Sequence, residues 1–182
     1  AEAGMLQTGD QLLDQSTSDN DTLNAVISNA NKNAEPTLLN IENVNLDLDV
    51  FSGAAFDADL TEGSTITASS SKLGFNGEFT LNNAGDNSVV AGENVTNLIV
   101  NDLEAGSVDT GAAEEATVDT ANASDDANVT VNGDIALTVS TTTETLNLTA
   151  TEDATVDFQA ISADEIIGSG EGVITVQGVT GV

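Results

Sequence analysis

The stretch from Asn128 to Gly178 consists almost entirely of short apolar–polar alternations separated by Gly, Asn, Asp, Ser and Thr. Its apolar positions recur every eight to ten residues: Val129/Val131, Leu137/Val139, Leu146/Leu148, Val156/Phe158, Ile166 and Ile174/Val176. Alternation with a period of two is typical of a β-strand, because successive side chains point to opposite faces. Strands at this spacing predict an all-β chain built from repeated short rungs.

The same pattern begins upstream at Thr37 and loosens over residues 52–77. Within Leu39–Val50 we expect the following side chains to face the core: Leu39, Ile41, Val44, Leu46, Leu48 and Val50. Asp47 and Asp49 alternate with them and are expected on an exposed sheet face. The apolar positions that continue the rungs are Phe51, Phe56, Leu60, Ile66, Leu73, Phe75, Phe79, Leu81, Val89, Val90, Leu98, Val100, Val108 and Val118. Residues 104–127 are acidic and rich in alanine, which predicts a surface loop between thin strands.

Residues 1–36 differ from the rest of the chain. Asn20 or Asp21 is suited to cap a short helix in which Leu23, Val26 and Ile27 share one face. Pro36 ends any such helix, because the residue before proline avoids the helical region. We therefore expect a small irregular or helical N-terminal cap over residues 1–36, followed by a β-rung domain over residues 37–182.

Two folds share the rung signal. A parallel β-solenoid, or β-helix, stacks short strands from successive coils. An antiparallel β-sandwich also spaces short strands at this interval, and the dipeptides Asn76-Gly77 and Asn132-Gly133 favour its hairpin turns. The core candidates are mostly small and β-branched, with only five Phe and no Trp or Tyr, which suits thin coils better than a sandwich. The solenoid is the leading prediction.

Composition excludes most partners and most chemistry. The 182 residues hold 31 acids against two bases, Lys32 and Lys72, so the formal net charge is −29. Such a surface repels nucleic acid and anionic membranes, and no apolar run is long enough to span a bilayer. Without His, Cys or Arg, the usual nucleophilic triads and phosphoryl-transfer sites cannot be built. We expect no enzyme; a carbohydrate-active enzyme on a β-helix is the weakest alternative, because an aromatic sugar platform is also missing.

The abundant acids instead favour a hard cation, which prefers six to eight oxygen ligands. The best candidate cluster lies in the N-terminal turns, and its members are Asp10, Asp14, Asp19 and Asp21. Weaker candidates are Asp125, Asp126, Asn128, Glu152 and Asp153. A solvated loop acid or amide is the alternative for each of these side chains, and it is favoured for the second group. The lack of imidazole and thiolate disfavours transition metals.

The chain contains four short motifs: Thr8-Gly9-Asp10, Asp19-Asn20-Asp21-Thr22-Leu23-Asn24-Ala25, Leu39-Asn40-Ile41-Glu42-Asn43-Val44-Asn45 and Thr145-Leu146-Asn147-Leu148-Thr149. These motifs resemble those of bacterial surface-layer and RTX-like secreted proteins. The resemblance implies β-solenoid segments that bind calcium and form a lattice on the cell exterior. The chain departs from that family in one respect: the glycine-rich calcium nonapeptide is absent, and its nearest counterpart at residues 168–172 lacks the Asp.

These observations predict a secreted structural subunit of a surface layer or extracellular filament, stabilised by cations. Its expected partners are further copies of itself, because unpaired strand edges at the ends of a solenoid pair readily with another chain. The alternative is an adhesin-type or matrix-binding module, for which a cell-surface polysaccharide is the expected partner.

Overall fold

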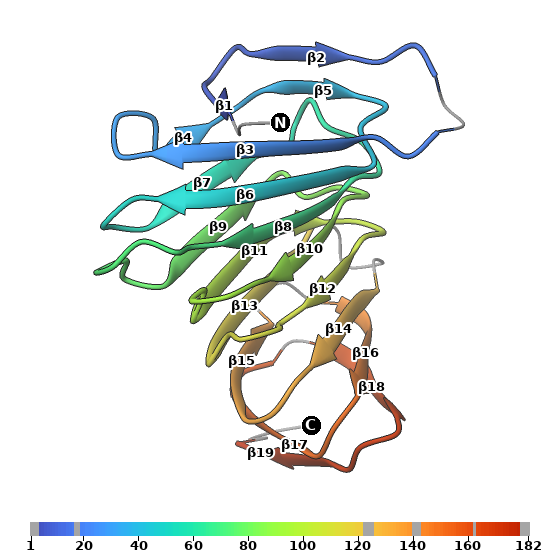
Figure 1. Ribbon diagram of the computed structural model, residues 1–182. Coiled ribbons are helices and arrows are strands. Elements are labelled where there is room, and N and C mark those ends of the chain that lie inside the picture. Colours follow the sequence, from blue (N-terminus) through green and yellow to red (C-terminus); the bar gives the residue numbers. More distant parts are fainter. Residues whose placement is uncertain (1–3, 17–18, 122–125, 140–142, 162, 179–182) are drawn as a thin grey trace.

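The computed structural model describes residues 4–16, 19–121, 126–139, 143–161 and 163–178. In these residues the chain contains strands and turns but no helix, and it winds into a parallel β-solenoid of about eight turns (Figure 1). The predicted solenoid is thereby confirmed. The antiparallel sandwich is wrong, because the strands of each described sheet pair in parallel.

One wall of the solenoid is a nine-stranded sheet. Its strands, in spatial order, are β1 (Gly4–Met5), β3 (Thr22–Ser28), β6 (Asn43–Asp49), β8 (Thr65–Ser69), β10 (Ser88–Ala91), β12 (Ser107–Asp109), β14 (Ala127–Val131), β16 (Thr143–Ala150) and β18 (Ala163–Gly170). Each strand is therefore followed in the sheet by a strand from the next coil. The strands rotate progressively along the stack, so that β14 is steeply inclined to β3 in Figure 1.

The facing wall is an eight-stranded sheet. Its strands, in chain order, are β4 (Asn33–Ala34), β7 (Ala54–Asp57), β9 (Glu78–Asn82), β11 (Asn97–Leu103), β13 (Glu115–Thr120), β15 (Ile135–Val139), β17 (Ala154–Ala160) and β19 (Ile174–Gln177). A short two-stranded sheet, β2 (Gln11–Leu13) with β5 (Thr37–Leu39), lies at the N-terminal end. The chain crosses from the nine-stranded to the eight-stranded wall along one edge of the solenoid and returns along the other.

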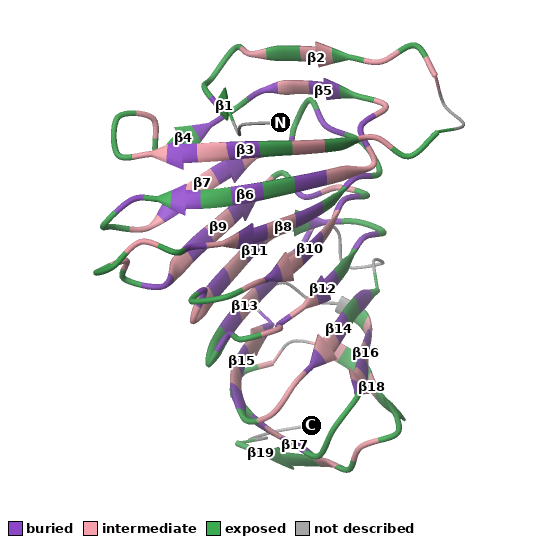
Figure 2. Ribbon diagram, in the orientation of Figure 1, coloured by how far each residue is buried: buried purple, intermediate pink, exposed green. Residues whose placement is uncertain are grey.

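The core lies between the two walls and is mostly aliphatic, with Phe56, Phe79 and Phe158 as its aromatic members. In β6, Val44, Leu46 and Leu48 are buried while Asn45 and Asp47 are exposed, as the strict alternation predicts. Buried positions alternate with half-buried or exposed ones in most strands of both walls, whereas β18 and β19 at the C-terminal end have no buried residue (Figure 2). Because partners from successive coils are in register, the buried residues stack in columns along the solenoid.

The outer faces carry columns of polar side chains that bond from coil to coil. Asn45 Nδ2 donates to Asn24 Oδ1 over 3.0 Å, and Asn101 Nδ2 donates to Asn82 Oδ1 over 2.9 Å. Asn147 Nδ2 donates to Asn128 Oδ1 over 3.2 Å. Asn128, one of the predicted metal ligands, is therefore part of a surface ladder of amides. Such ladders satisfy the amides within the stack and help to fix its register.

The N-terminal region departs from the prediction. The expected helix with Leu23, Val26 and Ile27 on one face is wrong, because residues 22–28 form β3 and pair with β6 along its whole length. The buried positions are Ala25 and Ile27, with Val26 on the outer face. In this strand the buried side chains alternate with a period of two, and one of them is the small Ala25. Over only seven residues, such a pattern is easily mistaken for the spacing of apolar residues along a helix.

Several expected core positions lie outside the core. Leu39 is exposed and Leu38 is buried in its place, because a left-handed turn at Asn40, with φ of 55°, separates β5 from β6 and shifts the alternation. The apolar side chains that lie in turns and are exposed are Phe51, Leu60 and Leu73. Val90 in β10 is half-buried and points away from the core, since its neighbours Val89 and Ala91 are the buried ones.

The predicted surface loop over residues 104–127 is wrong in part. This region contains β12 and β13, and its alanines help to fill the core: Ala113 and Ala116 are buried. The two Asn-Gly dipeptides are not hairpin turns either. Gly77 and Gly133 adopt φ values of 87° and 91° in connections that carry the chain from one wall to the other.

Candidate metal site and acidic cavity

Three of the predicted metal ligands come together at the N-terminal end of the solenoid. Asp14 directly follows β2, Asp21 directly precedes β3, and Asp19 lies in the connection between these strands. One carboxylate oxygen from each residue lies within 4.8 Å of the other two. Among the described residues no other group of three acids meets this criterion.

Hydrogen bonds fix the Asp14 carboxylate and the Asp21 backbone of this Asp14–Asp19–Asp21 triad. The Ser16 amide donates to Asp14 Oδ2 over 2.6 Å, which fixes the turn after β2. From the next coil, Glu42 Oε2 accepts a 2.7 Å bond from the Asp21 amide. The Asp21 carbonyl in turn accepts a 3.0 Å bond from the Asn43 amide, so β3 and β6 are tied together beside the triad.

The electrostatics of the triad are unfavourable without a counterion. Partial burial raises the pKa of Asp21, and the negative charges of Asp19, Asp14 and Glu42 raise it further. Four carboxylates therefore repel one another at neutral pH. Carboxylate oxygens are the ligands that calcium prefers, and a bound divalent cation would turn this repulsion into attraction.

The raised pKa predicts a pH dependence with a definite sign. Because the folded pKa of Asp21 lies above its unfolded value, the folded state holds the proton more tightly. In chelator, the stability contributed by this group is therefore present below the unfolded pKa and is lost as pH rises through the folded pKa. Asp21→Asn is expected to raise the melting temperature at neutral pH and to lose this advantage on acidification.

The measurement is a series of thermal unfolding curves in chelator across the acidic range, recorded by circular dichroism. Asp47→Asn serves as the control, because Asp47 is an exposed acid on the same wall of the solenoid. A difference between the Asp21 variant and the parent protein that stays constant over the whole pH range would contradict the assignment.

The remaining predicted ligands lie elsewhere. Asp10 Oδ2 accepts a 2.9 Å bond from the Gln7 amide and stands outside the triad. Asp126 is exposed just before β14, and Asp153 Oδ1 accepts a 3.0 Å bond from the Val173 amide. Neither they nor the exposed Glu152 belong to a three-acid group within the described part of the chain, and Asp125 falls outside that part.

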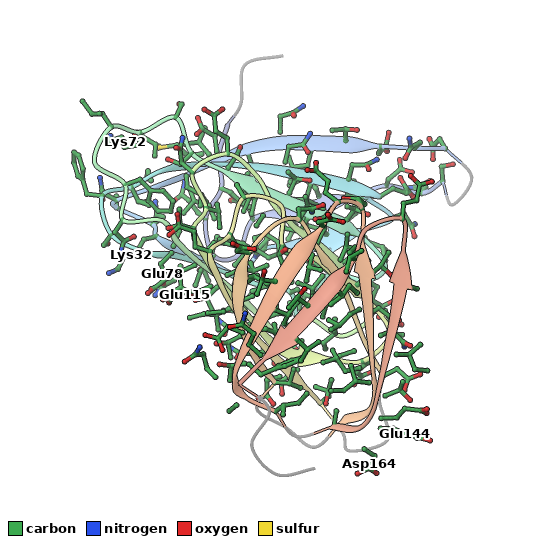
Figure 3. The ribbon with its side chains drawn as sticks, turned by 90° about the horizontal axis from the view of Figure 1, so that it is seen from below. Lys32, Lys72, Glu78, Glu115, Glu144 and Asp164 are labelled. Atoms are coloured by element: carbon green, nitrogen blue, oxygen red, sulfur yellow. The ribbon has the colours of Figure 1, made fainter. Side chains whose placement is uncertain are left out.

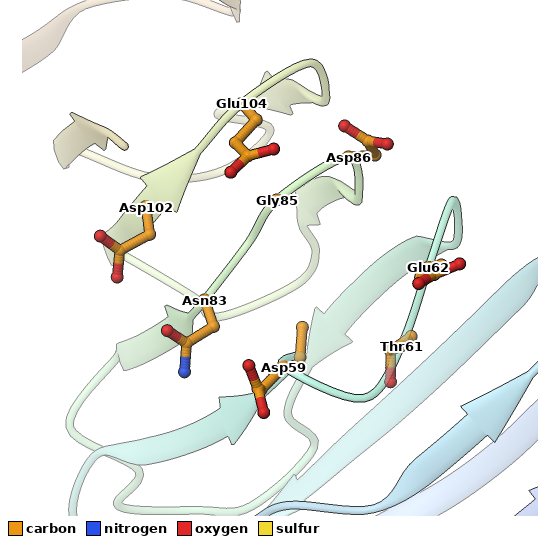
Figure 4. Close-up of a pocket in the computed structure, with 9 residues that line it drawn as sticks. Asp59, Thr61, Glu62, Asn83, Gly85, Asp86, Asp102 and Glu104 are labelled. Carbon is orange, nitrogen blue, oxygen red and sulfur yellow. The ribbon is translucent and has the colours of Figure 1, made fainter. Parts of the chain in front are cut away.

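A second acidic feature is not apparent from the sequence. A cavity of about 290 Å³ lies along the edge where the chain returns to the nine-stranded wall (Figure 4). Five acids from three successive coils line it: Asp59, Glu62, Asp86, Asp102 and Glu104. Left-handed backbone turns accompany three of them, since Asn83 and Gly85 precede Asp86, and Asp102 precedes Glu104, with φ values of 50°, 52° and 59°. The signal that marks this cavity is the recurrence of acids at the same turn in consecutive coils, which becomes visible only once the coils are aligned.

The chain has no match among known families. No family model, no curated protein and no solved structure matches it. Among the residues that the structure describes, no helix is long and apolar enough to cross a bilayer.

Proposed function

We propose that this protein is a secreted structural subunit of an extracellular assembly, a surface layer or a filament, whose folding and association depend on calcium. The observation that carries the proposal is the Asp14–Asp19–Asp21 triad, three oxygen ligands held within 4.8 Å of one another in a fold that has no imidazole or thiolate. A divalent cation there joins the connection after β2 to β3, and so stabilises the first coils of the stack.

The architecture supports a structural role. Two walls of in-register parallel strands enclose a mostly aliphatic core, and the outer faces carry ladders of amides. A solenoid presents large, regular lateral faces, which suit repeated contacts between copies. A net charge of −29 opposes such contacts unless cations screen it, which makes calcium a requirement for assembly as well as for folding.

The test is calcium-dependent assembly of the purified protein. We expect sheets or filaments in electron micrographs at millimolar calcium and single particles after chelation. The double variant Asp19→Asn/Asp21→Asn is expected to need far more calcium for assembly. It is also expected to lose a calcium-induced rise in melting temperature of about 5 to 10 °C, as binding at roughly a hundred times Kd would give.

Asp47→Asn is again the matched control, and it should keep the calcium response of the parent protein. Assembly and melting temperatures that do not change between chelator and millimolar calcium would contradict the proposal.

The alternative role, a matrix-binding module, has one observation in its favour. A shallow cavity of about 410 Å³ lies on the outer face of the eight-stranded wall, and amide and hydroxyl side chains such as Asn97, Thr117, Thr138 and Gln159 line it. These groups are suited to the hydroxyls of a neutral polysaccharide. Selective retention of the monomeric protein on a glycan array would favour this role over the structural one.

A further inference from the structure

Both lysines of the chain lie on the edge where the chain crosses from the nine-stranded to the eight-stranded wall. Lys32 precedes β4 and is exposed, and Lys72 lies in the long connection between β8 and β9. Figure 3 shows the two lysines on the same side of the molecule as Glu78 and Glu115, away from Glu144 and Asp164. Exposed apolar side chains accompany them: Leu73 is 94% exposed and Phe51 is 58% exposed. We call Lys32, Phe51, Lys72 and Leu73 the lysine edge.

The lysine edge is an ordered surface. Lys72 Nζ forms an ion pair with Asp49 and lies 4.7 Å from the centroid of the Phe51 ring. The Phe51 amide donates to Asn29 Oδ1 over 3.1 Å, which ties it to the preceding coil. Gly74 packs beside the Phe51 ring, since a Cβ built there would lie 3.8 Å from Cδ1. The exposure of Leu73 and Phe51 is therefore a property of a fixed protrusion.

The opposite edge has the complementary character. There the chain returns from the eight-stranded to the nine-stranded wall, and the cavity described above presents its acids, with Asp59, Asp86 and Glu104 among them (Figure 4). We call the five acids of this cavity the acidic edge. One copy therefore carries both lysines and exposed apolar side chains on one side and an acidic hollow on the other.

We propose that the lysine edge of one copy docks into the acidic edge of a second copy. This inference rests on the proposed function and names the contact that builds the assembly. Burial of exposed apolar side chains such as Leu73 in an interface lowers the free energy, because it removes apolar surface from water. Lys72 is already paired with Asp49, whereas Lys32 is exposed and forms no ion pair among the described residues. Lys32 is therefore the side chain that can pair with an acid of the acidic edge of another copy.

The two edges differ, so the contact is heterologous and repeats without closing, which yields a ribbon or a layer. An anionic membrane is the other surface that an exposed Leu, Phe and Lys would suit. The net charge of −29 opposes an approach to such a membrane, whereas calcium between two copies relieves the repulsion that remains.

The test is sedimentation equilibrium at millimolar calcium with variants of each edge. Leu73→Ser, which removes an exposed side chain, and Lys32→Glu are each expected to weaken association about tenfold or more. Asp86→Asn/Glu104→Gln should weaken it similarly from the other side. Met5→Ser is the control, because Met5 is 60% exposed but lies on the outer face of β1.

A mixing experiment identifies the geometry. The Leu73→Ser variant retains its acidic edge and the Asp86→Asn/Glu104→Gln variant retains its lysine edge. A mixture of the two is therefore expected to form one-to-one dimers and nothing larger. Extended arrays in that mixture, or a parent protein and a Leu73→Ser variant that associate equally, would overturn the inference and leave the proposed function standing.

A parent protein that stays monomeric in calcium would instead remove the proposed function and this inference with it. Binding to vesicles of equimolar phosphatidylcholine and phosphatidylglycerol that is lost in Leu73→Ser, with association unchanged, would assign the lysine edge to membranes and overturn the inference alone.

Discussion

Replacing Asn87 by alanine is expected to lower the free energy of unfolding by about 3 to 5 kcal/mol, because it leaves several buried backbone groups without a partner. Asn87 is 1% exposed and lies in the turn between β9 and β10. Its Nδ2 donates to the carbonyls of Thr61 and Ala84 over 2.8 and 2.9 Å, and its Oδ1 accepts a 2.9 Å bond from the Ser64 amide.

The position of Asn87 between coils extends the effect of the Asn87→Ala substitution beyond its own turn. Ser64 Oγ donates to the Ile41 carbonyl, so the polar contacts continue from Asn87 through Ser64 to a third coil. In a solenoid each coil contacts only its neighbours. A defect between two coils therefore weakens the coupling between the coils on either side, which can then unfold independently. We therefore expect the Asn87→Ala variant to unfold in two steps, the coils before Asn87 separately from those after it.

Urea denaturation followed by circular dichroism measures both effects. Asn45→Ala is the matched control, since the Asn45 amide bonds to Asn24 on the exposed outer face. Its loss is expected to stay within about 0.5 kcal/mol, as for most surface substitutions. Equal losses for the two variants would show that the buried network adds nothing beyond a surface amide pair.

The rungs could be predicted from the sequence because their signal is local. Where one face of a strand is buried, the alternation itself records which residues point inward, as in Val129/Val131 and Leu137/Val139, all four of which are buried. The same reasoning failed at β3, where the small Ala25 occupies a core position and Val26 does not. Over a short strand, one small residue in the core is enough to make two periods look alike.

The turns could not be predicted because their alignment depends on coil length. Partners one coil apart are separated by 19 residues at Ser88 and Ser107 but by 23 at Ser64 and Asn87. No single period in the sequence therefore places one turn above another. For this reason neither the acidic edge nor the Asn87 network can be predicted from the sequence.

The triad was accessible to sequence reasoning for the opposite reason. Asp14, Asp19 and Asp21 are close in the chain, and a single connection between two strands brings them together. Glu42, which hydrogen-bonds to the Asp21 amide from the next coil, was not foreseen as part of this site. Residues that are close along the chain can thus be predicted to share a site when one turn holds them all. Residues from different coils cannot be grouped in this way.

Phe79→Ala and Phe51→Ala are expected to have different effects, the first on the stability of the fold and the second on association between copies. Phe79 is fully buried and stands in register with Ala54 on one side and Leu98 on the other. Its truncation leaves a cavity that the neighbouring Ala54 is too small to fill, so Phe79→Ala is expected to cost about 3 to 5 kcal/mol of stability. Phe51, by contrast, is largely exposed, and its contact with Lys72 is a cation–π pair worth about 0.5 to 1 kcal/mol at such a site.

The two variants should therefore divide their effects. Phe79→Ala should unfold at lower urea, yet its folded population should associate as the parent protein does, because its surface is unchanged. Phe51→Ala should keep nearly the parent stability and associate about tenfold more weakly, because it removes apolar surface from the lysine edge. Urea midpoints and sedimentation equilibrium on the same samples make the comparison. A Phe51→Ala protein that loses stability without losing association would place Phe51 among the groups that hold the fold together and remove it from the contact between copies.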